Sequence, residues 1–172
     1  GLYWRKRVIV MAVEKRMPGV SQYGSVDPAP AEFKGDVTSW ATTLRDESLP
    51  MFQRMRSVFS LRNLGSDDAC LALCSGFSAS SALLRHELAY VLGQMQNDTA
   101  LPALIERLSD AEEHIMVRHE AAEALGAIGN LKAKPVLEEF LHDENPEVAE
   151  SCEVALDLLN WCSTSEWENA EW

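Results

Sequence analysis

The sequence predicts an all-α fold in which pairs of helices stack into a solenoid. After residue 35 no stretch alternates apolar and polar residues as a strand does, and the chain reads helix, turn, helix. One segment recurs, and it is marked by four aligned leucines, Leu61, Leu92, Leu125 and Leu156. They lie 31, 33 and 31 residues apart. Helix pairs repeated at such a spacing bury their apolar faces against their neighbours.

Each aligned leucine belongs to the second helix of a pair. The four segments that align are residues 55–61, 86–92, 119–125 and 150–156. A shorter amphipathic helix is expected before each of them, over residues 37–44, 69–77, 99–108 and 134–141. Pro102 and Pro135 fall near helix starts, where a missing N–H group costs little. Gly65, Gly129 and Asn130 suit helix ends, where left-handed backbone is common.

The type of repeat follows from the composition of these helices. Periods near 33 residues also occur in ankyrin and tetratricopeptide arrays, but the Thr-Pro-Leu-His and Trp-Leu-Gly signatures of those arrays are absent. Short helices rich in Ala, Leu and Gly favour HEAT-like repeats. The predicted architecture is therefore an α-solenoid of four HEAT-like helix pairs over residues 36–160.

Three segments flank the predicted repeats. Residues 1–24 form an unmatched basic segment, residues 25–35 a proline-rich linker in extended conformation, and residues 161–172 an acidic tail containing tryptophan. Because Gly1 is not an initiator Met, the sequence is expected to be a fragment, a processed product or an incomplete gene model.

Charge and cysteine content restrict the function. The net charge is -12, and residues 1–24 contribute five basic and one acidic side chain, which leaves -16 on the rest. Such an acidic body repels nucleic acid and attracts a basic partner, although solubility alone explains it equally well. No run of 18 apolar residues predicts a membrane span. The four cysteines lack CxxC spacing, which argues against disulfides or zinc and favours the reducing cytoplasm.

Two His-Glu pairs are the candidate chemical groups. His86-Glu87 and His119-Glu120 occupy the same position in consecutive repeats. The first and fourth repeats have Met55-Arg56 and Glu150-Ser151 there instead. Equivalent positions on adjacent helices face the same way, with axes about 8–10 Å apart, so both imidazoles can reach one metal ion. Mixed His and carboxylate ligands suit non-haem iron, manganese or zinc.

Structural interpretations of the same residues remain open. Each Arg-His-Glu segment also suits a polar helix start, although its recurrence in only two repeats favours a metal site. Gly93 and Gly126 each follow a histidine by seven residues; close helix packing is the favoured interpretation, and an opened path to the metals the alternative. His114 is expected in a loop and His142 at a solvated helix end. No phosphate-binding loop, G-x-S-x-G elbow or Cys-His nucleophile pattern is present.

The sequence resembles the deoxyhypusine hydroxylase family. The resemblance is carried by LRHELAYVLGQMQ (residues 84–96), MVRHEAAEALGAI (116–128) and ESCEVALD (150–157), and by the linker SVDPAP (25–30). It covers roughly residues 25–160. The resemblance implies oxygen-dependent hydroxylation of the deoxyhypusine side chain of translation initiation factor 5A at a non-haem di-iron centre. It also implies two facing halves of four repeats, each with two His-Glu pairs.

The resemblance assigns roles to the two pairs. His86 and His119 are implied to bind one iron, and Glu87 to reach the second iron. Glu120 is also counted among the metal-site residues. The resemblance implies that it is a catalytic carboxylate beside the ions or against the substrate amine, rather than a direct ligand.

Further expectations concern the substrate and the missing ligands. Gly93 and Met116 match positions expected to line the substrate channel, and the acidic surface fits a basic, polyamine-like side chain. The sequence corresponds to the carboxy-terminal half alone, so we expect an inactive monomer that needs the missing amino-terminal half or a second copy related by two-fold symmetry. A non-catalytic HEAT scaffold that binds a partner is the alternative function, and a bilin lyase-type protein is a third.

Overall fold

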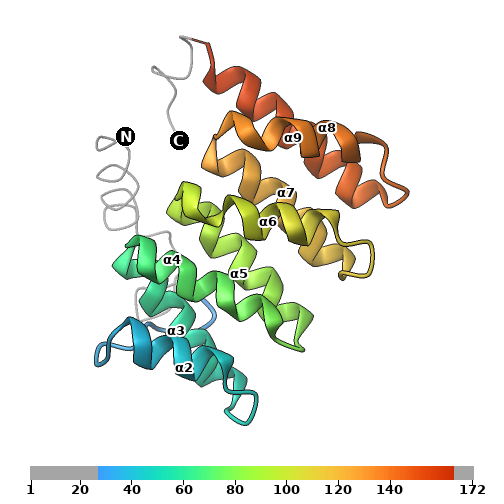
Figure 1. Ribbon diagram of the computed structural model, residues 1–172. Helices are drawn as coiled ribbons and strands as arrows, with labels where there is room; N and C mark the ends of the chain where they lie inside the picture. The colour runs from blue at the N-terminus through green and yellow to red at the C-terminus, as the bar shows by residue number, and fades with distance from the viewer. Residues whose placement is uncertain (1–26, 165–172) are drawn as a thin grey trace, which may run out of the picture. The chain divides into compact units, whose positions relative to one another are not determined.

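The computed structural model describes residues 27–164 of the chain (Figure 1). Two compact units are distinguished, Gly1–Pro30 and Ala31–Trp172, and only residues 27–30 of the first unit are described. All the helices described below belong to the second unit, and residues 27–164 contain no strand. The predicted all-α class is therefore confirmed.

The second unit consists of four helix pairs. They are α2 (Val37–Arg45) with α3 (Met51–Leu64), α4 (Asp67–Cys74) with α5 (Ala82–Met95), α6 (Leu101–Ser109) with α7 (Ile115–Ile128), and α8 (Lys134–Glu139) with α9 (Pro146–Cys162). Each shorter helix packs on the longer helix of its own pair, and α3, α5, α7 and α9 contact one another in chain order. This is the stacking that the 31- to 33-residue period predicts.

Local signals set the ends of these helices. The Ser81 side chain accepts a hydrogen bond from the first turn of α5 and fixes its start. Pro102 and Pro135 lie in the first turns of α6 and α8, as predicted. Gly65 and Gly129 end α3 and α7 with φ of 68° and 76°, the left-handed conformation that favours glycine.

The aligned leucines lie in the core. Leu61, Leu92 and Leu125 are fully buried, and Leu156 is 7% exposed. Helix α9 continues to Cys162, two residues beyond residue 160, where the repeat region was predicted to end. The buried Leu159 keeps the last turn packed on the core. Most of the predicted tail, residues 165–172, and the predicted basic segment, residues 1–24, lie outside the described residues.

Ion pairs connect successive repeats at the starts of the longer helices. The arginines in question directly precede the two histidines. An Nη atom of Arg85 lies 2.6 Å from Glu113, and one of Arg118 lies 2.5 Å from Asp143; both acids stand in the loop of the following repeat. The Nε atom of Arg118 also donates to the Leu108 carbonyl. These contacts turn the arginines toward the loops and fix the position of each helix start.

Two simpler expectations concern cysteines and membranes. All four cysteines are free thiols. No helix within residues 27–164 is long and apolar enough to cross a membrane.

Candidate metal centre

The last three long helices, α5, α7 and α9, approach one another closely. A Cβ atom placed on Gly93 of α5 would lie 3.0 Å from the α-carbon of Ala124 on α7. One placed on Gly126 of α7 would lie 2.8 Å from the α-carbon of Ala155 on α9. The missing side chains therefore allow backbone to pack on backbone, the interpretation favoured from the sequence. This packing brings the histidine-bearing helices α5 and α7 together.

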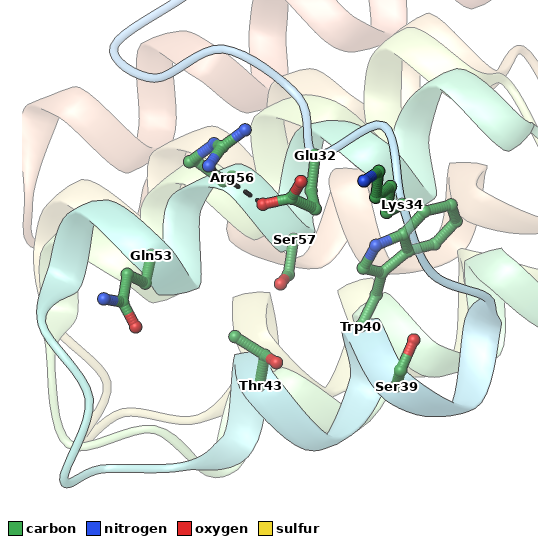
Figure 2. Close-up of a pocket in the computed structure, with 8 residues that line it drawn as sticks. All are labelled: Glu32, Lys34, Ser39, Trp40, Thr43, Gln53, Arg56 and Ser57. Atoms are coloured by element: carbon green, nitrogen blue, oxygen red, sulfur yellow. Dashed lines mark ion pairs between the residues drawn. The ribbon is translucent and has the colours of Figure 1, made fainter.

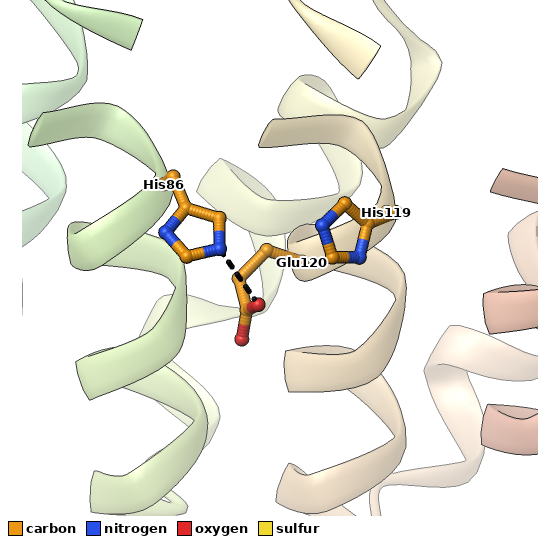
Figure 3. Close-up of side chains that lie close together, drawn as sticks. All are labelled: His86, His119 and Glu120. Carbon is orange, nitrogen blue, oxygen red and sulfur yellow. Dashed lines mark ion pairs between the residues drawn. The ribbon is translucent and has the colours of Figure 1, made fainter. Parts of the chain in front are cut away.

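His86, His119 and Glu120 form a compact cluster on these two helices (Figure 3). The Nε2 atom of His86 lies 3.1 Å from Oε2 of Glu120. The two imidazole rings have centroids 5.8 Å apart and are tilted by 44°. One potential ligand atom from each of the three residues lies within 4.8 Å of the others. The structure thus brings together three of the four residues of the two His-Glu pairs, and Glu87 is not part of the cluster.

The electrostatics of the cluster reflect partial burial among like charges. Burial, followed by the charges of Glu123 and Glu87, raises the pKa of Glu120 to about 7. Burial and the neighbouring His119 lower the pKa of His86, against the charge of Glu123. Near neutral pH the His86 ring is therefore uncharged and has a lone pair available to a metal.

These residues fit a bound cation. Donor atoms bound at about 2 Å to one ion lie at most about 4 Å apart, so small side-chain rotations suffice to bring the three ligand atoms onto one ion. A cation also offsets the repulsion from Glu123 and Glu87, which adds to the effect of burial on the pKa of Glu120. In addition, the Nδ1 atom of His86 is buried without a hydrogen-bond partner. The donor set of imidazole and carboxylate is one that non-haem iron accepts.

The other predicted site residues are placed differently. Glu87 is half-buried and lies outside the three-residue cluster, though its charge acts on Glu120. Met116 is half-buried in the first turn of α7, one turn before His119. Gly93 is buried against α7, which accounts for the glycine by packing; its part in a substrate channel stays a prediction. His114 caps the start of α7, and His142 is exposed, as expected.

Two residues that the sequence reasoning missed complete the surroundings. Glu123 lies one turn after His119, and its Oε1 atom is 3.4 Å from Nδ1 of His119. Ser151 of α9 donates a hydrogen bond of 3.0 Å to the same oxygen. The i,i+4 spacing of His119 and Glu123 was a usable signal; the contribution of Ser151, 28 residues further on, was not.

An acidic hollow opens beside His119. Its volume is about 330 Å³, and it lies between α7 and α9. It is lined by His119, Glu123, Glu147, Glu150, Ser151 and Val154. A hollow with three carboxylates favours a cationic ligand group.

A second hollow lies in the first repeat, on helices other than those of the histidine cluster (Figure 2). Its volume is about 350 Å³ and its lining includes Trp40, Lys34 and the ion pair between Glu32 and Arg56. It contains none of the predicted site residues.

The fold and the repeated pairs define the class of protein. A family model described as HEAT repeats matches residues 71–157, which is half of the chain. The chain belongs to the HEAT-repeat family.

Several deoxyhypusine hydroxylases are similar to this chain over most of its length. Deoxyhypusine hydroxylase of Gallus gallus is 51% identical over 154 residues, covering 90% of this chain and 52% of the relative. The enzyme of Saccharomyces cerevisiae is 48% identical, covering 87% of this chain and 47% of the relative. The solved structure of human deoxyhypusine hydroxylase in complex with glycerol matches with a TM-score of 0.78 and 44% identity, over 91% of this chain and 54% of that chain. The predicted resemblance is confirmed, and the chain spans about half the length of these relatives.

Proposed function

We propose that this chain supplies half of a deoxyhypusine hydroxylase-type enzyme, with part of a non-haem di-iron centre. The observation that carries the proposal is the cluster of His86, His119 and Glu120, formed by repeats that place the same pair in register. The similarity to deoxyhypusine hydroxylases at 44–51% identity supports the same reaction. The proposed substrate is the deoxyhypusine side chain of translation initiation factor 5A.

The residues of the cluster have distinct proposed roles. His86 and His119 hold one iron through ring nitrogens, and Glu87 serves a second ion whose histidines belong to another half. Bound iron supplies the activation of molecular oxygen. Glu120 is the proposed catalytic carboxylate, because its Oε2 atom lies 3.1 Å from Nε2 of the proposed iron ligand His86.

The surroundings of the cluster suit a basic substrate. The acidic hollow next to His119 offers Glu123, Glu147 and Glu150 to an ammonium group. Met116, a turn before His119, is proposed to contact the aliphatic part of the side chain. Gly93 acts on this region through the close approach of α5 and α7 that it permits.

The proposed di-iron centre needs ligands beyond those of one chain. Two histidines and their neighbouring carboxylates provide half of the four His-Glu pairs. The partner that completes the centre is the other half of the enzyme or a second copy of this chain paired by two-fold symmetry. A monomer of this chain is therefore proposed to be inactive.

Iron content measured together with oligomeric mass tests the proposal. We expect about one iron per chain in a completed dimer, because each copy holds one ion with its two histidines. The double variant His86→Ala/His119→Ala should lose this iron, whereas His142→Ala, which removes an exposed histidine elsewhere, should retain it. Iron that persists in the double variant contradicts the proposed site.

Activity and partner binding separate the enzyme from the alternative scaffold. If the chain is a non-catalytic HEAT scaffold, the double histidine variant should bind its partner unchanged and wild type should hold no iron in any oligomeric state. If it is half of the hydroxylase, the completed protein should hydroxylate the deoxyhypusine form of the factor. Hydroxylation by a demonstrated monomer contradicts the proposed inactivity of the lone chain.

A further inference from the structure

A chain of hydrogen bonds reaches His119 from the fourth repeat. Ser151 Oγ on α9 donates to Oε1 of Glu123 at 3.0 Å. The same carboxylate oxygen lies 3.4 Å from Nδ1 of His119, one turn earlier on α7. Glu123 thus stands between a buried serine and a proposed metal ligand.

Neither residue is required by the repeat. The positions equivalent to Glu123 in the first, second and fourth repeats are occupied by Phe59, Tyr90 and Val154. The positions equivalent to Ser151 in the three earlier repeats are occupied by Arg56, Glu87 and Glu120. Helix packing therefore accepts apolar and aromatic side chains where Glu123 stands. The carboxylate is present only in the repeat where the preceding turn carries His119.

The bond to Nδ1 has a chemical consequence for the other ring nitrogen. A neutral imidazole carries one N–H, and an acceptor at Nδ1 holds the proton there. The Nε2 atom then keeps its lone pair for a metal or another acid. A carboxylate in this position also fixes the ring orientation and raises its basicity. Ser151, 7% exposed, holds Glu123 in place.

The two histidines of the cluster differ in this respect. The Nδ1 atom of His86 is buried without a hydrogen-bond partner, and its Nε2 atom meets Glu120. His119 alone has a carboxylate at Nδ1 from its own helix.

We propose that Glu123 is a positioning residue for His119: held by Ser151, it keeps the ring as the Nδ1–H tautomer and presents Nε2 to the site. The effect of this arrangement on metal binding rests on the proposed function. The tautomer of His119 does not depend on the proposed function. Loss of such a supporting carboxylate lowers metal affinity by about 10- to 100-fold in comparable sites.

The tautomer is measurable in the metal-free protein. Nitrogen-15 NMR of the neutral His119 ring should show the Nδ1–H form in wild type and a shift toward the Nε2–H form in Glu123→Ala. Glu123→Gln keeps an acceptor oxygen and should restore much of the wild-type pattern. Glu150→Ala removes the same charge from the same hollow and should leave the tautomer unchanged. Because Glu123 is an exposed residue, these variants should fold normally.

Titration with Fe²⁺ alone then separates this inference from the proposed function. Glu123→Ala should weaken Fe²⁺ binding by about 10- to 100-fold. Glu123→Gln should weaken it less, and Glu150→Ala should change the Fe²⁺ affinity little. An unchanged His119 tautomer in Glu123→Ala overturns the inference, whatever the metal affinity. If Glu123→Ala shifts the His119 tautomer but the wild-type protein binds no Fe²⁺, the inference is supported and the proposed function is contradicted.

Discussion

Gly93 on α5 lies so close to Ala124 on α7 that a methyl group at position 93 would be 3.0 Å from the α-carbon of Ala124. This contact sets the separation of the two helices that carry His86 and His119. The corresponding contact of Gly126 with Ala155 is tighter, at 2.8 Å, but joins α7 to α9. The same substitution at the two glycines therefore tests the packing of α5 on α7 separately from the packing of α7 on α9.

Gly93→Ala and Gly126→Ala should both strain the helix packing. Overpacking costs about 1–3 kcal/mol, against a gain of about 1 kcal/mol from helix propensity. We expect Gly126→Ala to lower the free energy of urea unfolding, because the α-carbon of Ala155 cannot move aside like a flexible side chain. Gly93→Ala should lower Fe²⁺ affinity more than Gly126→Ala does. Equal effects on Fe²⁺ binding contradict the role given to the Gly93 contact.

Arg118→Ala should strongly destabilise the third repeat. Arg118 is 4% exposed, pairs with Asp143 and donates to the Leu108 carbonyl. Removing one partner of a buried pair leaves the other charge uncompensated and costs about 3–5 kcal/mol. Lys134→Ala is the control, since its pair with Glu138 is exposed and should contribute less than about 1 kcal/mol. Urea unfolding of both variants measures the difference; similar losses contradict the argument.

Stability should fall in acid because of two loop carboxylates. Burial opposes ionisation of Asp143, but hydrogen bonds from Arg118 and Asn145 outweigh it and hold its pKa below the usual range. Burial likewise opposes ionisation of Glu113, and hydrogen bonds led by Arg85 lower its pKa. A lowered folded-state pKa stabilises the protein above about pH 4, and this stabilisation is lost as the pH falls through the folded-state values.

The acid effect is measurable by comparison with Asp143→Asn. Above about pH 4 the variant should unfold at lower urea concentration than wild type. The gap should close as the pH falls and Asp143 becomes protonated in wild type. A gap independent of pH indicates that the loss arises from geometry and not from the charge of Asp143.

Ser81→Ala should weaken the start of α5, the helix that carries His86. The Ser81 side chain accepts a hydrogen bond from the Leu84 amide at 3.2 Å. Loss of such a cap costs about 1 kcal/mol. Ser81→Asp, which retains an acceptor, should preserve the midpoint of thermal unfolding, whereas Ser81→Ala should lower it. A lowered midpoint in both variants points to a role of Ser81 other than capping.

The periodic features of this protein were readable from the sequence. Spacing of the leucines predicted four helix pairs, and prolines and glycines marked several helix ends correctly. The end of α4 was less accurate: the expected segment 69–77 merges that helix with the 3₁₀ turn Ser75–Ser78. The apolar pattern continues through the turn, while the backbone hydrogen bonds change.

The sequence by itself determined which residues occupy the facing positions of consecutive repeats, and so paired His86 with His119. This was possible because a repeat converts sequence spacing into spatial neighbourhood. Only the tertiary structure decided that Glu120 meets Nε2 of His86 and that Ser151 holds Glu123 against His119. These contacts depend on side-chain rotamers and on the separation of helices set by Gly93 and Gly126, neither of which is encoded in a periodic pattern.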